Sequence, residues 1–223
     1  MPVIVGPTAG GKSSLATSLV ATLGSRGVDA ELISADAIQI YRSLDIGSAK
    51  PTPDEQRQVS HHLIDVVEPE SSYSVHQWLE AANRAIEGVR TRGRVPIVVG
   101  GTHLYVKALL YGLFEGPGAD EGLREELRAI EPGLRREELE RVDPEAAARI
   151  HPNDERRTVR ALEVHRLTGR PISVQQSQWD AAPRADAVLV GLLWETEAIN
   201  QRINARVRAM VERGLVEEAR GLW

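Results

Sequence analysis

Short apolar runs alternate with longer segments of helical periodicity along the first half of the chain. The runs predict strands because they are brief, rich in branched residues and bounded by polar or Gly/Pro positions. Strands that alternate with helices are typical of βαβ units, so the pattern predicts an α/β fold with a doubly wound parallel sheet. The predicted strands are residues 3–6, 31–35, 63–67 and 95–99, and the predicted helices are residues 12–23 and 75–92.

From about Gly116 the pattern changes to short, charge-rich helical segments punctuated by Gly and Pro. An apolar run returns only at residues 187–193, and a last helix is predicted at 196–213. We therefore predict a P-loop core made of residues 1–115 and 185–223. Residues 116–184 are predicted to form a helical insertion.

Capping residues mark where several of these helices begin. Ser74 is placed to cap the helix that starts at residue 75, and Asp143-Pro144 combines an N-cap with proline at the first helical position. Asn153 or Asp154 can start the arginine-rich helix that follows. These local signals predict helix starts without reference to the rest of the fold.

Composition narrows the class of protein. The chain has 223 residues, 42% of them apolar, which is enough for one sizeable core with a small appended unit. No run approaches the roughly 18 apolar residues of a membrane span, so we expect a soluble, cytoplasmic protein, with a monomer as the plain expectation. There are no cysteines, which excludes thiolate chemistry and leaves oxygen, nitrogen and a hard cation.

Charge leaves two interpretations of the arginine-rich segment open. The net charge of −5 argues against a protein coated in nucleic acid. A local basic face can nevertheless exist, or the segment can be a solvated helix face with pairs such as Glu163 near Arg160 and Arg166. The basic residues concerned are Arg156, Arg157, Arg160, Arg166 and Arg170, with His151 and His165 beside them.

A phosphate-binding loop follows the first predicted strand. The segment from Gly6 to Ser13 matches G-x-x-x-x-G-K-[ST] and lies between a strand and a helix, as the motif requires. Glycines let backbone N–H groups surround phosphate oxygens, Lys12 supplies a charge, and the Ser13 hydroxyl can reach Mg²⁺. The predicted loop residues are Gly6, Pro7, Thr8, Ala9, Gly10, Gly11, Lys12 and Ser13, with Ser13 as the metal ligand.

The loop alone does not identify the phosphate compound. A motor-type NTPase would carry an acid after a later strand, but the run ending at Val99 continues into Gly100-Gly101-Thr102. The second strand does end in an acid, Asp36, which we place on a strand neighbouring the loop strand and facing the ligand crevice. Asp36 is either a base acting on an acceptor group or a cap of the next turn.

An ordered set of motifs closely resembles the bacterial tRNA dimethylallyltransferases, also called tRNA isopentenyltransferases. The set spans almost the whole chain, which makes another family improbable. The motifs are Gly6-Pro-Thr-Ala-Gly-Gly-Lys-Ser13, Ser34-Ala-Asp36-Ala-Ile-Gln39-Ile-Tyr41, Asp45-Ile-Gly-Ser-Ala-Lys50-Pro51, His62-Leu-Ile-Asp65, Val99-Gly-Gly-Thr102-His-Leu-Tyr105, and His151-Pro-Asn-Asp154 with Arg157 and Arg160.

The resemblance implies transfer of a dimethylallyl group from dimethylallyl diphosphate to N6 of the adenosine 3′-adjacent to the anticodon in tRNA. In this family pattern Asp36 corresponds to the general base. The leaving diphosphate would be held by the loop backbone, Lys12, Mg²⁺ on Ser13, Thr102 and Arg206. Arg202 lies one helical turn from Arg206, so the choice between these two arginines stays open.

The resemblance also implies contacts with the anticodon stem-loop of tRNA, partly through the helical insertion. An enzyme that modifies a stacked base must flip it out, and residues 36–39 match the segment that reads it. The implied tRNA-binding residues are Asp36, Ala37, Ile38, Gln39, Thr102, Arg124, Arg156, Arg157, Thr158, Val159 and Arg160.

Some features depart from the family pattern, and rival functions remain. Gly10 replaces the usual serine, and family members continue beyond the point that matches Trp223, so we expect the C-terminal part of the family to be missing. His61 and His62 are adjacent on a predicted strand and point oppositely, which argues against zinc. The rivals are a small-molecule kinase, an adenylate isopentenyltransferase and a nucleic-acid-binding module with a nucleotide switch.

Overall fold

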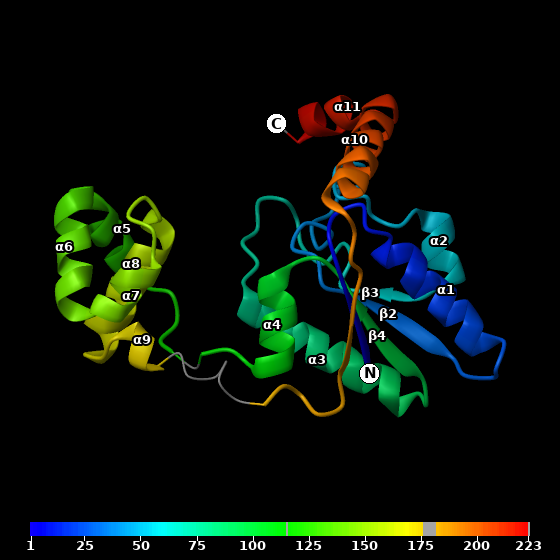
Figure 1. Ribbon diagram of the computed structural model, residues 1–223, viewed down its shortest axis with the longest axis horizontal. Helices are drawn as coiled ribbons and strands as arrows, with labels where there is room; N and C mark the ends of the chain where they lie inside the picture. Colours follow the sequence, from blue (N-terminus) through cyan, green and yellow to red (C-terminus); the bar gives the residue numbers. More distant parts are fainter. Residues whose placement is uncertain (115, 176–181, 223) are drawn as a thin grey trace. The chain divides into compact units, whose positions relative to one another are not determined.

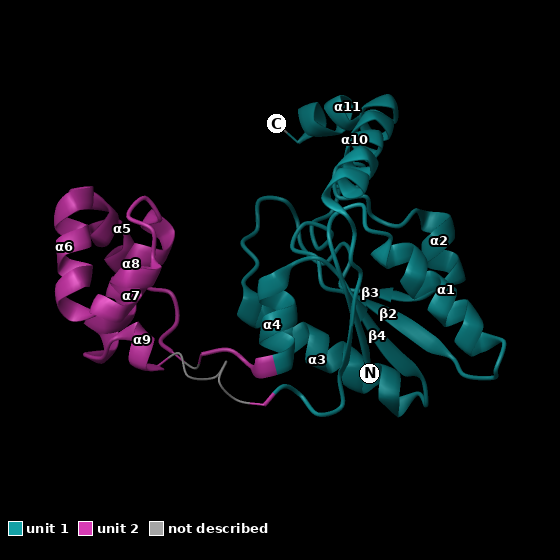
Figure 2. Cartoon of the chain, viewed as in Figure 1, with its two compact units in different colours: residues 1–110, 183–223 teal, residues 111–182 magenta. Residues whose placement is uncertain are grey.

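The computed structural model describes residues 1–114, 116–175 and 182–222. This part of the chain divides into two compact units (Figure 2). The sheet unit comprises residues 1–110 and 183–223, and the helical unit comprises residues 111–182. The helices in the described residues are all too short or too polar to cross a membrane.

The sheet unit is built on parallel strands in the order β3-β2-β4-β1-β5. Figure 1 labels β3, β2 and β4 of this sheet. This arrangement confirms the predicted α/β fold with a doubly wound parallel sheet. The strands are β1 (Pro2–Val5), β2 (Ala30–Ser34), β3 (His61–His62), β4 (Val95–Val99) and β5 (Val188–Gly191), and the helices are α1 (Lys12–Gly24), α2 (Pro53–Gln58), α3 (Val75–Thr91), α4 (His103–Tyr111), α10 (Thr196–Glu212) and α11 (Leu215–Gly221).

Helices cover the central strands on both faces. Ile4, Leu32 and Ile97 form one core cluster with Ala16 of α1. The residues that alternate with them along the strands point to the other face, where α3 packs through its buried Trp78. Strand β5 lies at the edge, and all its residues are exposed. The core is therefore centred on β2, β4 and β1.

The prediction of a strand at residues 63–67 was wrong. Only His61 and His62 pair with β2, and a single isolated bridge joins Tyr41 to Val67. Leu63 and Asp65 have φ values of 63° and 56°, which an extended strand of non-glycine residues does not tolerate. The apolar run instead turns away from the sheet edge.

The helical unit contains α5 (Glu121–Ala129), α6 (Pro132–Val142), α7 (Pro144–Arg149), α8 (Glu155–Thr168) and α9 (Ile172–Gln175). Leu127, Leu139, Val159 and Leu162 lie at the centre of its own apolar core. Its borders at 111 and 182 fall a few residues from those expected at 116 and 184. The unit thus has a core separate from that of the sheet.

Helix starts agree with the capping signals. The Ser74 side chain accepts from Gln77 N–H in a capping box. Asp143 accepts from Ala146 N–H and Asp154 accepts from Arg157 N–H, which settles the alternative between Asn153 and Asp154. These short-range hydrogen bonds account for the accuracy of the predicted starts.

Candidate active site

The phosphate loop connects β1 to α1 and turns sharply. Ala9 and Gly11 have φ values of 60° and 90°, and Gly10 N–H donates to the Pro7 carbonyl at 3.0 Å. A Cβ at Gly10 would lie 2.9 Å from that carbonyl, so this compact turn favours glycine where the family has serine. Left-handed residues within such a loop help backbone N–H groups converge on an anion.

Lys12 is held by the loop itself. Its Nζ donates to the carbonyl oxygens of Gly6 at 3.0 Å and Pro7 at 2.9 Å. Burial of the ammonium lowers its pKa, and although Asp36 opposes this effect, Arg206 adds to it. The charge is therefore positioned within the loop without a direct carboxylate partner among the described residues.

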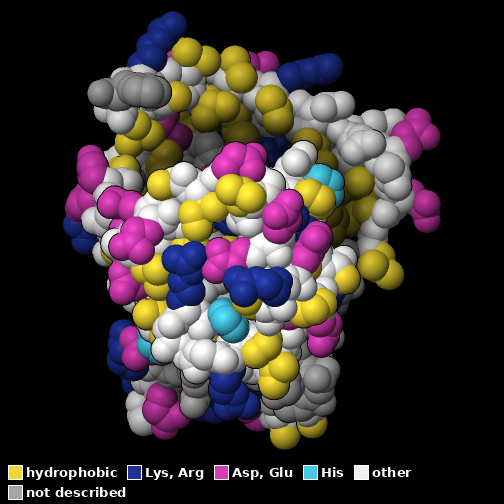
Figure 3. Space-filling view, turned by 90° about the vertical axis from the view of Figure 1, so that its left-hand side faces the viewer, with side chains coloured by type: hydrophobic (Ala, Val, Ile, Leu, Met, Phe, Trp, Pro, Cys, Tyr) yellow, Lys and Arg dark blue, Asp and Glu magenta, His cyan; other side chains and the backbone are white. Residues whose placement is uncertain are grey.

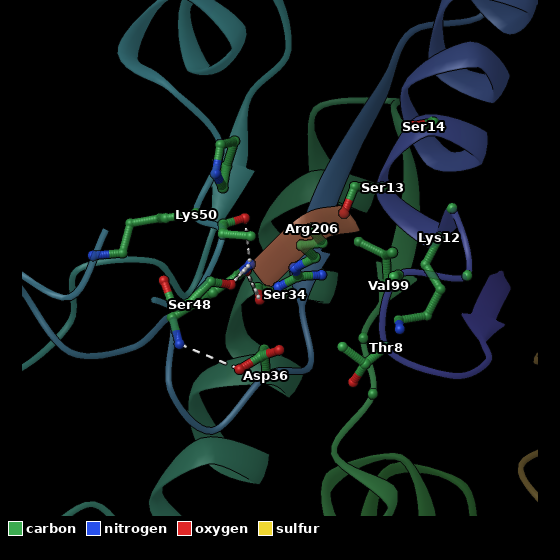
Figure 4. Close-up of a pocket in the computed structure, with 18 of the residues that line it drawn as sticks. Thr8, Lys12, Ser13, Ser14, Ser34, Asp36, Ser48, Lys50, Val99 and Arg206 are labelled. Carbon is green, nitrogen blue, oxygen red and sulfur yellow. Dashed lines mark hydrogen bonds between the residues drawn. The ribbon is translucent and has the colours of Figure 1, made fainter. Parts of the chain in front are cut away.

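A cavity of about 1450 Å³ adjoins the loop and draws its walls from several segments of the sheet unit. Figure 4 shows Thr8, Lys12, Asp36 and Arg206 around this space. Gly6, Pro7 and Ala37 are not part of its lining. The predicted site residues that line it are Thr8, Ala9, Gly10, Gly11, Lys12, Ser13, Asp36, Ile38, Gln39, Thr102 and Arg206.

Asp36 begins the loop after β2. One carboxylate oxygen, Oδ1, accepts from the N–H groups of Ile38 at 2.9 Å and Gln39 at 3.3 Å. The carboxylate therefore does cap the next turn, as one of the two interpretations held. Its other oxygen has no hydrogen bond from the described residues, which leaves it available to accept a proton in the cavity.

Strand β4 separates β2 from the loop strand β1, so Asp36 does not follow a strand directly paired with β1. This corrects the sequence-based placement. The Asp36 loop is instead fixed by the end of β4, because Ala37 N–H donates to Thr102 Oγ1 at 2.9 Å. Gly100 permits the close approach, since a Cβ there would lie 2.1 Å from the Ala35 carbonyl. The Thr102 hydroxyl retains its own proton for donation.

Helix α10 contributes two arginines to the cavity wall, and they are the two between which the family pattern left the choice open. Arg202 and Arg206 both line the cavity. Arg202 Nε donates to the Ala9 carbonyl at 2.8 Å, and its guanidinium lies 4.5 Å from the centre of the Trp194 ring. Trp194 Nε1 donates to the Gly10 carbonyl at 3.0 Å. Nothing in the sequence near Trp194 signalled this contact.

The opposite wall includes the loop at residues 48–50, whose role sequence reasoning also missed. Lys50 Nζ lies 2.6 Å from Oδ1 of Asp45 and from Oδ1 of Asp65. The Gln39 amide donates to the carbonyl oxygens of Ser48 and Ala49, each at 3.3 Å. Gln39 therefore links the end of β2 to this loop. The family motif around Lys50 was the available signal.

The donor set fits a magnesium ion that arrives with a phosphate. The only predicted protein ligand is the Ser13 hydroxyl, a hard oxygen at the start of α1. Within the described ranges, no three His, Asp or Glu side chains are placed to hold a metal ion. Mg²⁺ commonly takes one or two protein oxygens and completes its shell with phosphate and water.

Comparison with known proteins identifies the family. The sequence model of IPP transferase matches residues 39–223, and that of isopentenyl transferase matches residues 1–69. The chain belongs to the IPP transferase family. A tRNA dimethylallyltransferase of Thermotoga maritima is 46% identical over 99% of the chain and 71% of the relative. One of Halorhodospira halophila is 48% identical over 96% of the chain and 70% of the relative.

Solved structures of the family share this fold. The full-length tRNA isopentenylpyrophosphate transferase of Bacillus halodurans has a TM-score of 0.65 and 41% identity, covering 99% of the chain and 69% of that protein. A eukaryotic dimethylallyltransferase acting on tRNA has a TM-score of 0.85 and 30% identity, covering the whole chain and 55% of that protein. These likenesses confirm the predicted family and its P-loop fold.

In this IPP transferase the predicted tRNA-binding residues of the helical unit differ in exposure. Arg156 and Arg157 are exposed at the start of α8, whereas Thr158 and Val159 are buried. Arg124 and Arg160 both bind Glu163, which is fully buried. The run at residues 156–160 therefore combines surface arginines with core residues.

The sequence-based pairing of Glu163 with Arg166 was wrong. Arg166 instead pairs with Glu138 at 3.0 Å, and Glu163 lies inside the unit. Basic and acidic side chains lie interspersed on the face shown in Figure 3. The solvated-face interpretation thus fails for Glu163, while Arg156 and Arg157 remain on the surface.

Proposed function

We propose that this IPP transferase moves a dimethylallyl group from dimethylallyl diphosphate to N6 of the adenosine 3′-adjacent to the anticodon in tRNA. One observation carries the proposal: a phosphate loop and an aspartate with an uncommitted oxygen line the same cavity in a member of this family. The proposed acceptor places the activity in the cytoplasm. The exposed arginines at the start of α8 are the proposed contacts of the helical unit with tRNA.

The proposed chemistry is a displacement at C1 of the prenyl group. The N6 nitrogen forms a bond to C1 while the bond from C1 to the diphosphate oxygen breaks, and Asp36 accepts the proton that N6 loses. Charge that develops on the leaving diphosphate meets the loop N–H groups, Lys12 and Arg206. The Thr102 hydroxyl is proposed to donate to the same group.

Magnesium fits this proposal as a partner of the diphosphate. Ser13 would hold the ion, which would neutralise part of the charge on the leaving group. The side chains of the loop and α10 would fix the diphosphate, and the Asp36 loop would position the acceptor nitrogen. Removal of Mg²⁺ with a chelator is therefore expected to weaken diphosphate binding.

The test follows the transfer of a labelled dimethylallyl group from its diphosphate to unmodified tRNA and, in a parallel reaction, to AMP. A third reaction contains ATP and a small alcohol, and it measures ATP consumption. Label in tRNA supports the proposal. Label in AMP alone would favour an adenylate isopentenyltransferase, and ATP consumption without prenyl transfer would favour a kinase. A transcript with guanosine at the target position is the matched control, because it lacks the N6 amine.

Asp36→Asn separates binding from chemistry. A general base contributes about 10²- to 10⁴-fold, so we expect kcat to fall by that order. Asparagine can still accept from Ile38 and Gln39 N–H, which preserves the turn, and diphosphate affinity is expected to stay close to that of the parent. Equal losses of affinity and turnover would remove Asp36 from the proposed role.

A further inference from the structure

The helices α10 and α11 bury very little, although α10 forms a wall of the cavity. Both helices are described in full, and within them only Met210 is buried. Hydrophobic burial normally supplies most of the energy that holds a helix against its neighbours. The placement of this helical pair must therefore depend on other contacts.

The first set of contacts joins Trp194, just before α10, and Arg202 of α10 to the phosphate loop. Trp194 and Arg202 donate to the consecutive carbonyl oxygens of Gly10 and Ala9. The Arg202 guanidinium also lies over the Trp194 ring, 4.5 Å from its centre. These donors satisfy two loop carbonyls at the position where Ala9 adopts its left-handed conformation.

The second set of contacts joins α11 to the loop on the opposite wall. The Glu218 carboxylate accepts from three consecutive N–H groups, those of Asp45 at 2.8 Å, Ile46 at 2.6 Å and Gly47 at 2.9 Å. Burial opposes ionisation of Glu218, but these hydrogen bonds outweigh it and lower its pKa. The loop continues directly into Ser48 and Lys50, which line the cavity.

We infer that two anchors hold α10 across the diphosphate site and thereby position Arg206. The loop anchor is Trp194 with Arg202, and the second anchor is Glu218. This inference rests on the proposed function for the identity of the ligand. Arg206 lies between the anchors along the chain, and its guanidinium lines the cavity without a side-chain hydrogen bond to the described residues. Trp194 and Glu218 are positioning residues, because they act through the loops and through α10.

The first experiment removes one hydrogen bond at the loop anchor. Trp194→Phe keeps a ring beneath Arg202 but loses the indole N–H. A hydrogen bond of this kind is worth about 0.5–1.5 kcal/mol, so we expect magnesium pyrophosphate to bind roughly 2- to 12-fold more weakly by calorimetry. Leu193→Ala is the matched control, because its side chain is 95% exposed and its affinity is expected to stay at the parent value.

The second experiment removes the charge at the other anchor. Glu218→Gln places an amide N–H₂ against backbone donors, and hydrogen bonds to a charged acceptor are worth more than neutral ones. We expect pyrophosphate to bind about 10-fold more weakly. Glu217→Gln is the control on the same helix, since the one ion pair of Glu217 with the described residues is the exposed pair with Arg220 at 3.8 Å.

The double variant, which combines Trp194→Phe with Glu218→Gln, tests whether the two anchors hold the same helix. With one anchor lost the other still restrains α10, so the combined loss of affinity is expected to exceed the product of the single losses. In the transfer reaction KM for the prenyl diphosphate should rise and kcat should fall as well, since Arg206 also meets the charge that develops on the leaving diphosphate. The thermal midpoint should change little, because these helices bury so little.

Unchanged pyrophosphate affinity in both single variants would overturn the inference. A loss of affinity in the double variant equal to the product of the two single losses would also overturn it, because the anchors would then act separately. Losses of affinity that follow a fall in the thermal midpoint would overturn it too, because the residues would then have a merely structural role. The binding series needs neither tRNA nor turnover. If pyrophosphate affinity depends on both anchors but the chain transfers no prenyl group, the proposed function is refuted and the inference about the anchors still holds.

Discussion

In the sheet unit, Lys12 and Arg202 donate to backbone carbonyl oxygens, whereas in the helical unit Arg124 and Arg160 meet the carboxylate of Glu163. Carbonyl dipoles orient a cation without cancelling its charge, while a carboxylate neutralises it. The first arrangement leaves positive charge for an anionic ligand. An arginine-rich sequence is therefore a poor guide to an anion site until the partners of each arginine are known.

The largest expected effect comes from removing the carboxylate that joins two arginines in the helical unit. Glu163→Gln leaves Arg160 without a carboxylate partner among the described residues and Arg124 with the exposed Glu121 at 3.6 Å, and breaking a buried pair costs about 3–5 kcal/mol. Hydrogen exchange of the α8 amides should report this loss. Glu138→Gln breaks the more exposed pair with Arg166 and should cost less than about 1 kcal/mol. Equal losses of stability in the two variants would contradict the distinction between the buried and the more exposed carboxylate.

The sheet unit has its own charge-compensated cluster, which predicts a dependence of stability on acid. A hydrogen bond from Arg92 outweighs burial and, with His62 and Arg94, lowers the pKa of Glu31 from 4.5 to about 2. Because the folded pKa is the lower one, this stabilisation is complete above pH 4.5 and is lost as pH falls toward 2. Denaturant unfolding at several pH values measures it.

Substitutions separate the contribution of Glu31 from general acid unfolding. Glu31→Gln should lower the free energy of unfolding by about 3 kcal/mol near neutral pH and flatten its slope between pH 4.5 and 2. Glu87→Gln, on the exposed face of α3, should leave the slope as it is. If the free energy of unfolding of Glu31→Gln has the same slope with pH as that of the parent, other carboxylates cause the loss of stability in acid.

Lys12→Met should weaken ligand binding without lowering stability, whereas Glu163→Gln should lower stability. Methionine retains the apolar stem but loses a charge-assisted contact worth about 1.5–3 kcal/mol, so pyrophosphate affinity should fall roughly 10- to 150-fold in calorimetry. The free energy of unfolding should not fall, because burial already disfavours the charged ammonium. Arg208→Gln, an exposed change on α10, serves as the control for both measurements.

The smallest effect is expected at the surface arginines of α8. Arg156→Gln should weaken binding of the proposed tRNA partner a few-fold and reduce the salt dependence of affinity by roughly one counterion. Filter binding at several salt concentrations measures this slope. Arg166→Gln is the matched comparison, since Arg166 is already paired with Glu138. Identical slopes for Arg156→Gln and the parent would argue against a phosphate contact there.

Local signals predicted much of the fold because the interactions behind them are short in sequence. The phosphate loop, the cap at Ser74 and the strand at residues 95–99 all depend on neighbours within a few positions. The strand at 63–67 failed for the converse reason. Its apolar composition suggested a strand, but the positive φ values of Leu63 and Asp65 direct the chain away from β2.

The candidate site was predictable where a motif places a group at a strand end, as with Asp36 and Thr102. Its geometry was not, because the insertion of β4 between β1 and β2 is a matter of strand order. The resemblance to a family supplied the chemistry that periodicity could not. Residues outside its motifs, such as Trp194, gave no signal.

The amino-acid sequence by itself determined the loop from Gly6 to Ser13, the alternation of strands and helices, and the starts of the capped helices, since each depends on backbone preferences and nearby side chains. Only the tertiary structure decided which cationic side chains have no carboxylate partner and so leave their positive charge uncompensated. Arg202 reaches Ala9 across 193 positions, and Arg124 reaches Glu163 across 39. Whether a cation meets a carbonyl or a carboxylate depends on such distant contacts, which sequence spacing does not encode.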